Sequence, residues 1–242
     1  MSASSPFSAA PDFLTTHWSV VIRARDAEPT EALTALEQLC LAYWQPLYTF
    51  ARCSGLTPPD AQDVVQGFFA QLIARQGLRR VDPSKGRFRS FMLASLRNFM
   101  ADERDRAHAA KRGGGAEVLS LDFALAEKAF ERQFANSESP ERAFDRAWAM
   151  AVLERAQARV REECVAAGKG GLYEALGPAS AEESYASVGA RLGLSESAIK
   201  TAAFRLRRRY RDLIRNEIAQ TVSTEAELND ELDGLLCAVG RG

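Results

Sequence analysis

Apolar residues recur at three- and four-residue intervals along almost the whole chain, and strand-like alternation is scarce. Ala, Leu, Arg and Glu, which favour helices, are abundant. This pattern predicts an all-α fold. The predicted helices span residues 14–25, 30–54, 58–76, 87–110, 141–167, 183–192 and 196–219.

Three consecutive glycines interrupt this pattern. Gly113 to Gly115 follow a charged helix end, and the helical spacing weakens from there to Pro140. Consecutive glycines end a helix and favour a flexible connection. We therefore expect two helical domains joined by a flexible linker. The expected parts are an N-terminal extension (1–29), a first domain (30–112), the linker with an amphipathic stretch near 119–134 (113–140), a second domain (141–220) and an acidic tail (221–242).

The second domain carries the pattern of a helix-turn-helix. Gly193 suits the left-handed residue of a tight turn, and Ser195 is placed to cap the helix that follows. Small polar groups near the start of that helix suit base edges in a major groove, and its arginines suit phosphates. The alternative is an ordinary helical hairpin with a solvated face. The candidate DNA-binding residues are Ser195, Ser197, Lys200, Thr201, Arg205 and Arg208.

One residue departs from the usual helix-turn-helix pattern. Gly189 stands where such motifs usually hold alanine. A glycine inside a helix weakens it by up to about 1 kcal/mol.

The first domain has a capped helix followed by a basic, aromatic one. Thr57 is placed as the N-cap, with Pro58 at the first helical position and Asp60 three residues after the cap. In the helix over 87–110, arginines interleave with phenylalanines. The aromatic spacing fits a core, but basic groups around aromatic rings also suit single-stranded nucleic acid.

The charge distribution supports both motifs. A net charge of −1, from 31 basic and 32 acidic residues, by itself argues against a nucleic-acid-binding protein. However, residues 78–112 and 200–215 each carry a net charge of +6, and acidic segments elsewhere cancel them. Two basic blocks therefore coincide with the two candidate DNA-binding helices.

Four segments in this order resemble the extracytoplasmic-function (ECF) sigma factors of bacterial RNA polymerase. They read LCLAYWQPLYTFAR, DAQDVVQGFFAQL, GRFRSFMLASLRNFMADERDR and YASVGARLGLSESAIKTAAFRLRRRY, and the resemblance covers about 35–112 and 141–216. Its most specific part is the arrangement of Arg97, Asn98 and Asp102. The resemblance implies that the first domain binds the polymerase clamp and opens the minus-ten promoter element. The second domain would then read the minus-thirty-five element.

The resemblance also implies roles for single residues. Contact with core RNA polymerase is implied for Asp60, Asp63, Gln66 and Phe69. Contact with promoter DNA is implied for Lys85, Arg87, Phe88, Arg89, Arg97 and Asn98, in addition to the six helix-turn-helix residues. This chain departs from the family at Gln62 and Gly67, which replace acidic residues, and over 158–183, where a longer segment replaces the usual opening of region four.

The sequence shows no pattern typical of a metal site or of a catalytic site. The four cysteines are scattered, and His17 and His108 are the only histidines, so neither a metal site nor a His-based triad is indicated. The adjacent glutamates at 162–163 and 182–183 point about 100° apart on a helix, which does not suit paired-carboxylate catalysis. We expect neither an enzyme nor a cofactor. Free thiols, no signal peptide and no apolar run of about 20 residues predict a cytoplasmic protein.

The sequence thus predicts a sigma factor whose partners are core RNA polymerase and promoter DNA. The alternative is a helix-turn-helix repressor or activator with an N-terminal dimerisation or ligand-binding domain. An anti-sigma factor or a regulatory kinase stays open as a further partner, since phosphorylation of Thr57 would add about −1.5 to −2 charge where acidic residues are missing. The acidic tail is either an amphipathic helix that covers part of the basic surface or a solvated helix.

Overall fold

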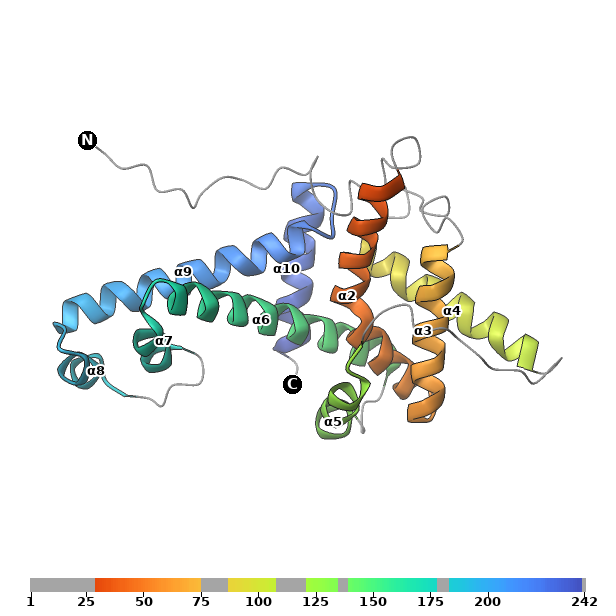
Figure 1. Cartoon of the computed structure of the whole chain (residues 1–242), viewed down its shortest axis with the longest axis horizontal. Helices are drawn as coiled ribbons and strands as arrows, with labels where there is room; N and C mark the ends of the chain where they lie inside the picture. Colours follow the sequence, from red (N-terminus) through yellow and green to blue (C-terminus); the bar gives the residue numbers. More distant parts are fainter. Residues whose placement is uncertain (1–28, 75–86, 108–120, 135–138, 178–182, 241–242) are drawn as a thin grey trace. The chain divides into compact units, whose positions relative to one another are not determined.

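The computed structural model describes residues 29–74, 87–107, 121–134, 139–177 and 183–240. Within these ranges all regular structure is helical, which confirms the all-α prediction. The helices are α2 (Pro29–Cys53), α3 (Pro58–Ala74), α4 (Phe88–Ala107), α5 (Phe123–Gln133), α6 (Pro140–Ala166), α7 (Gly170–Leu176), α8 (Tyr185–Leu192), α9 (Glu196–Ala219) and α10 (Glu225–Val239), all shown in Figure 1.

Six predicted helices coincide with α2, α3, α4, α6, α8 and α9, with ends that differ by at most three residues. The helix predicted over 14–25 lies outside the described residues. The acidic tail contains a helix, α10, and the amphipathic stretch near 119–134 contains α5.

The chain divides into two compact units, and the division falls within α6. Unit 1 comprises residues 1–151 and 218–242, and unit 2 comprises residues 152–217. The expected division lay instead in the segment 113–140. The acidic tail, expected as a separate part, belongs to unit 1.

The position of α5 explains this difference. Phe130 and Phe134, at the end of α5, are buried in a cluster with Ala143 and Ala147 of α6. At the other side of α5, Glu127 accepts hydrogen bonds at 2.9 Å from Nε and 2.8 Å from Nη2 of Arg52 in α2. Residues 121–134 are therefore a packed part of unit 1 and not a free connection.

The rest of the unit 1 core is aromatic. Its largest fully buried side chains include Tyr43 and Tyr48 of α2, Phe69 of α3 and Trp148 of α6. Phe88 of α4 is also fully buried, and its ring meets that of Tyr43 edge-on at a centroid distance of 5.1 Å. Phe88, the first residue of α4 and one of its interleaved aromatic residues, therefore packs in the core.

Close packing explains the glycine at position 67. A Cβ atom on Gly67 of α3 would lie 3.2 Å from Cζ of Phe99 in α4, and Phe99 is buried. Contacts this short require the neighbouring ring to shift. The acidic residue that the sigma-factor pattern expects at this position does not fit without such a shift.

A small core in unit 2 joins three helices. Ala175 of α7, Val188 of α8 and Ile199 of α9 form a buried cluster. Gly168, with φ 69°, lies in the turn after α6, and α7 begins two residues later at Gly170. A helix of seven residues is too short to show a clear apolar period. This helix, α7, lies within the segment 158–183, where the chain departs from the sigma-factor pattern.

Candidate nucleic-acid interface

The turn between α8 and α9 has the geometry that the sequence predicts. Gly193 adopts the left-handed conformation with φ 68°, and its backbone N–H donates to the carbonyl of Gly189. Ser195 caps α9, because its Oγ accepts a hydrogen bond from the Ala198 N–H at 3.2 Å. Ser184 caps α8 in the same way through the Ser187 N–H. Two caps and one glycine therefore fix where both helices begin and end.

The structure gives a reason for Gly189. This residue is buried, and its carbonyl also accepts the Leu194 N–H at 2.9 Å. A Cβ atom at position 189 would lie only 2.6 Å from the carbonyl oxygen of Leu194. An alanine here would therefore meet backbone that cannot rotate away, so the departure from the family pattern is required by this tight turn.

All six candidate residues of α9 and its cap lie at the surface. Ser195, Ser197, Lys200, Thr201, Arg205 and Arg208 are exposed. The Thr201 hydroxyl donates to the Ser197 carbonyl at 3.0 Å, and Lys200 Nζ lies 2.6 Å from a Glu196 carboxylate oxygen. Within the described part of the chain, Arg205 and Arg208 have no partner, and the Phe204 ring beside them is 61% exposed.

On the inner side of α9, Arg209 is paired with a carboxylate of the protein. Arg209 donates from Nε and Nη2 to both carboxylate oxygens of Glu163 in α6, at 2.7 and 2.6 Å. These hydrogen bonds lower the pKa of Glu163 below its ordinary value. One turn of helix therefore contains Arg209, which pairs with Glu163, next to Arg208, which has no partner among the described residues.

Arg97 and Asn98 of α4 are both exposed. The Arg97 guanidinium forms an ion pair with Glu141 of α6, and its Cζ lies 5.4 Å from the centroid of the Phe50 ring. A nucleic acid that binds Arg97 must therefore exchange with one surface carboxylate. Asn98 has no hydrogen-bond or ionic partner among the described residues, so a nucleic acid can bind it without displacing a protein group.

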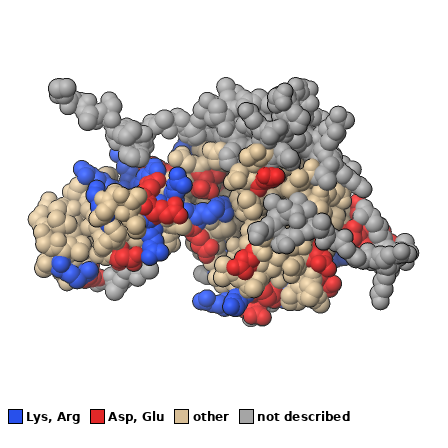
Figure 2. Space-filling view, viewed as in Figure 1, with Lys and Arg blue, Asp and Glu red and all other residues tan. Residues whose placement is uncertain are grey.

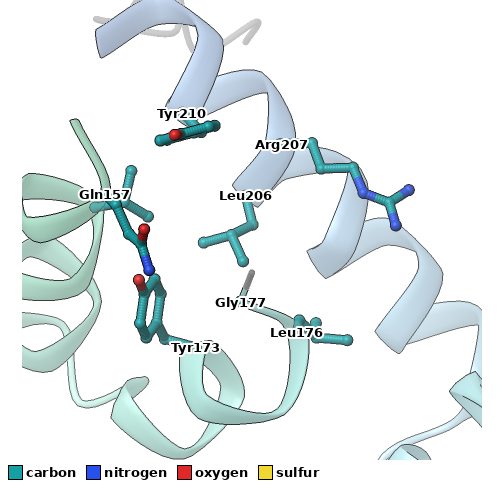
Figure 3. A pocket seen from close by; sticks show the side chains of 8 residues that line it. Gln157, Tyr173, Leu176, Gly177, Leu206, Arg207 and Tyr210 are labelled. Carbon is teal, nitrogen blue, oxygen red and sulfur yellow. The ribbon is translucent and has the colours of Figure 1, made fainter. Parts of the chain in front are cut away.

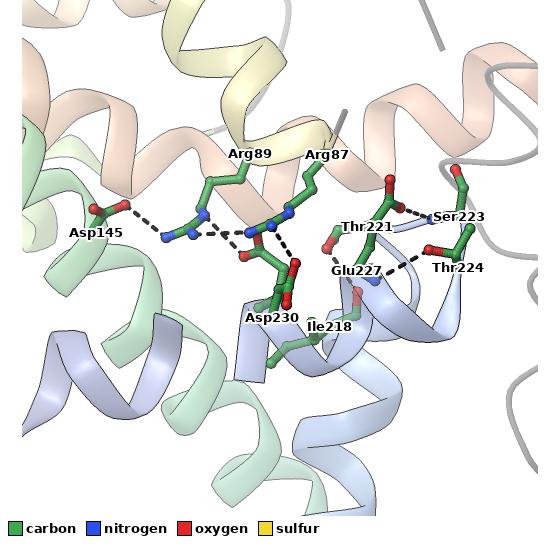
Figure 4. A network of polar contacts seen from close by, with 10 residues as sticks. Arg87, Arg89, Asp145, Ile218, Thr221, Ser223, Thr224, Glu227 and Asp230 are labelled. Carbon is green, nitrogen blue, oxygen red and sulfur yellow. Dashed lines mark hydrogen bonds and ion pairs between the residues drawn. The ribbon is translucent and has the colours of Figure 1, made fainter. Parts of the chain in front are cut away.

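Arg87 and Arg89, at the start of α4, lie in a network of carboxylates (Figure 4). Arg87 Nη1 and Nη2 are each 2.9 Å from an oxygen of Glu231 and Asp230 in α10. Arg89 Nη1 is 2.7 Å from Asp145 of α6, and its guanidinium stacks 4.3 Å from the centre of the Trp148 ring. Both arginines are thus already occupied by protein groups.

Two aromatic candidates belong to the core, and one basic candidate is not described. Phe88 and Phe69 are buried, so neither ring has a face available for a base or for a polymerase surface. The family roles implied for these two side chains are corrected accordingly, because packing against neighbouring helices already uses both rings. Lys85 lies outside the described residues.

The remaining polymerase candidates lie at the start of α3. Thr57 caps α3, because its Oγ accepts the Asp60 N–H at 3.4 Å, and its hydroxyl also donates to an Asp60 carboxylate oxygen at 2.6 Å. Asp60 and Asp63 are exposed and border a surface hollow of about 490 Å³ that also includes Glu103 and Arg104 of α4. Gln66 is half-buried. The structure therefore brings together two of the four residues at a mixed-charge surface.

Unit 2 also contains a cavity of about 250 Å³, mostly apolar, behind the helix-turn-helix (Figure 3). Tyr173, Leu206 and Tyr210 line it, together with Gln157. The Tyr173 hydroxyl is buried and has no hydrogen-bond partner among the described residues, whereas the Tyr210 hydroxyl donates to the Leu153 carbonyl at 3.2 Å. Leu206 and Tyr210 of α9 line the cavity and the exposed Arg207 borders it, whereas Arg208 lies about 200° around the helix from Leu206.

The sequence reasoning missed the acidic partners of Arg87 and Arg89. Asp145, Asp230 and Glu231 lie 56 to 144 residues away along the chain, so no local spacing reveals the contacts. One signal was available, because Glu231 falls on the same side of its helix as Leu228 and Leu235. A carboxylate on an apolar face needs a buried cation.

Other kinds of site find no support in the described residues. No group of three metal-ligating side chains occurs there, and none of the described helices has the apolar length that a bilayer requires. The four cysteines are free thiols. Comparison with protein-family models, curated proteins and solved structures finds no match for this chain.

Proposed function

We propose that this chain is a sigma factor that binds core RNA polymerase and directs promoter recognition and melting. The observation that carries the proposal is the outer face of α9. It combines a capped N-terminus, small hydroxyl side chains in the first turns and two arginines that have no partner in the part of the chain that the structure describes. This is the arrangement that a major-groove recognition helix needs.

In this proposal, different residues of α9 have different tasks. Ser197 and Thr201, in the first turns, approach base edges and contribute sequence preference. Arg205 and Arg208 contact phosphates and contribute salt-dependent affinity. The inner arginine, Arg209, stays with Glu163 and holds α9 against α6.

The proposed opening of the minus-ten element depends on α4. Arg97 and Asn98 are exposed there, and Arg97 releases Glu141 when it binds the displaced strand. Asp60 and Asp63 provide the polymerase contact at the start of α3. A cytoplasmic location and the absence of catalytic chemistry are parts of the same proposal, and a kinase acting on Thr57 remains its open regulatory partner.

The deciding experiment is run-off transcription with purified core polymerase and a promoter library. We expect a promoter-specific product that depends on this chain and falls at least about tenfold in an Arg205→Ala/Arg208→Ala variant. Arg161→Ala is the matched control, because Arg161 is an exposed arginine of the same unit that pairs with Glu174 instead. No chain-dependent product, together with dimeric binding to a palindromic duplex, would support a repressor or activator and overturn the proposal.

A second assay separates duplex binding from opening. Arg97→Ala and Asn98→Ala are expected to reduce promoter opening, followed with a fluorescent base in the minus-ten element, more than they reduce duplex affinity. Equal loss in both assays contradicts the roles proposed for α4.

A further inference from the structure

The helix α10 carries a carboxylate in an apolar position. Glu231 is fully buried, and it lies on the same face as the buried Leu228 and Leu235. A buried carboxylate loses its hydration, and this loss destabilises the fold unless charged partners and hydrogen bonds offset it. The groups that pair with Glu231 therefore help to hold α10 in its position.

Those partners are the two arginines at the start of α4. Glu231 Oε1 accepts a hydrogen bond from Arg87 Nη1 at 2.9 Å and another from Arg89 Nη2 at 3.3 Å. Its second oxygen lies 3.0 Å from Arg89 Nε, an ion-pair distance whose angles do not meet those of a hydrogen bond. One carboxylate thus faces two guanidinium groups.

The segment before α10 is also attached to the start of α4. The Phe88 N–H donates to the Thr221 carbonyl at 3.3 Å. The Thr221 hydroxyl donates to the Ile218 carbonyl (Figure 4), at 2.8 Å. Thr224 caps α10 by accepting the Glu227 N–H. A short connection therefore holds α10 next to Arg87 and Arg89, and the Thr224 cap defines where α10 begins.

We propose that α10 is an internal cover that competes with nucleic-acid phosphate for Arg87 and Arg89. This inference rests on the proposed function, because it takes the start of α4 as a DNA-binding surface. A guanidinium binds a carboxylate and a phosphate through the same forked donors, so it cannot serve both at once. The chain without DNA keeps this surface closed.

The two arginines differ in how readily they exchange. The Arg89 side chain is 15% exposed and stacks on Trp148, whereas Arg87 is 30% exposed and pairs with Asp230, which is itself 63% exposed. Water and salt screen an exposed pair more than a buried one. Phosphate therefore displaces Asp230 from Arg87 first, and α10 loosens from that side.

The test measures binding of a fluorescent single-stranded oligonucleotide to the full chain over a range of salt concentrations. The variant Asp230→Asn/Glu231→Gln keeps the size of both side chains and removes their charge. Each arginine released to a phosphate adds about fivefold to the affinity at 0.1 M salt and about 0.7 to the slope of log affinity against log salt. We expect a gain of about five- to twenty-five-fold. Adding Arg87→Ala to this variant should remove most of the gain.

Asp233→Asn is the matched control. Asp233 is an exposed carboxylate of the same helix with no partner among the described residues. It changes the net charge without freeing an arginine. The double variant removes two charges and this control removes one, so a gain in log affinity no larger than twice that of the control means that the cover does not exist.

Hydrogen exchange on the unmodified chain does not depend on how a variant folds. Saturating oligonucleotide should speed the exchange of the backbone amides over residues 225–239. Unchanged protection of these amides while the oligonucleotide is bound overturns the proposal.

The transcription assay, run with the same variants, separates the two proposals. A gain in oligonucleotide affinity without promoter-dependent product keeps the cover and rejects the sigma-factor role. Promoter-dependent product with no gain in log affinity beyond twice that of Asp233→Asn keeps the sigma-factor role and rejects the cover. If no form of the chain binds the oligonucleotide, the cover is rejected whatever the transcription result.

Discussion

The two basic segments that overlap α4 and α9 carry the same net charge, but their arginines differ in whether a carboxylate of the protein pairs with them. Each segment has a net charge of +6. At the start of α4, Arg87 and Arg89 pair with carboxylates, and Arg97 does so farther along. On the outer face of α9, Arg205 and Arg208 are exposed and have no partner in the described part of the chain.

The difference shows that the net charge of a segment is not the charge that it offers to a ligand. An arginine that is paired and partly buried contributes to folding, and a ligand must first displace its partner. An exposed, unpaired arginine attracts phosphate in the free protein. Figure 2 shows basic and acidic side chains interspersed on the visible face, as expected when many arginines have acidic neighbours. We expect α9 to bind DNA before α4 does.

The largest expected effect comes from removing an arginine at the start of α4. Arg89→Ala leaves the buried Glu231 with Arg87 alone and also removes the Asp145 ion pair and the contact with Trp148. Breaking such a buried pair costs about 3 to 5 kcal/mol. Urea unfolding followed by circular dichroism should show a loss of this size in the free energy of unfolding.

Arg205→Ala is the counterpart on α9. Because Arg205 is exposed and has no partner among the described residues, its removal should change the free energy of unfolding by less than about 0.5 kcal/mol. Similar losses in both variants would mean that the two helices do not differ as described.

The second largest effect concerns the turn that presents the arginines of α9. Gly189→Ala places a Cβ 2.6 Å from the Leu194 carbonyl oxygen, and overpacking of this kind costs about 1 to 3 kcal/mol. Unfolding and duplex binding should both weaken. Single-strand binding through α4 should change less, because α4 belongs to unit 1 and the turn to unit 2.

Gly171→Ala tests whether the effect is steric. A Cβ on Gly171 meets no atom within 4 Å, and alanine favours helices by up to about 1 kcal/mol over glycine. This variant should be as stable as the natural chain or more so. A Gly189→Ala variant of unchanged stability would show that the turn tolerates a side chain.

The helices and the turn were predictable because their signals are local. Helical spacing located six of the described helices, and Gly193 and Ser195 identified the turn and cap before α9. Each of these signals depends on residues within one or two turns of each other. The role of Thr57 as the cap of α3 was predictable for the same reason.

What could not be predicted depends on contacts between distant residues. The packing of α5 against α2 joins Glu127 to Arg52, 75 residues earlier, and α5 belongs to unit 1, whose boundaries with unit 2 fall within α6 and near the end of α9. The phenylalanines of α3 and α4 have the same helical spacing whether they pack or face solvent. Only the tertiary structure shows that Phe69 and Phe88 are core residues.

The third prediction compares two neighbours within α9. Arg209→Ala removes two hydrogen bonds to Glu163 from a pair that is partly exposed, so it should cost about 0.5 to 1 kcal/mol at neutral pH. Arg209 lowers the pKa of Glu163 in the folded chain. The pair therefore stabilises the protein above the ordinary carboxyl pKa, and this contribution is lost as the pH falls through the lowered value.

Urea unfolding at a series of pH values measures this effect. The difference in the free energy of unfolding between the natural chain and Arg209→Ala should shrink below about pH 4, as Glu163 becomes protonated in both states. A difference that stays constant down to pH 2 would mean that the Glu163 pair contributes nothing to it.

The smallest expected effect on stability, and the sharpest test of the comparison, belongs to Arg208. Because this side chain is exposed and has no partner among the described residues, Arg208→Ala should change the free energy of unfolding by less than about 0.5 kcal/mol. Its loss should instead reduce the salt dependence of duplex binding by about one phosphate contact. Arg209→Ala, one residue away, should leave that slope unchanged. The opposite result, with Arg209 setting the salt dependence and Arg208 the stability, would mean that the outer face of α9 is not the face that binds DNA.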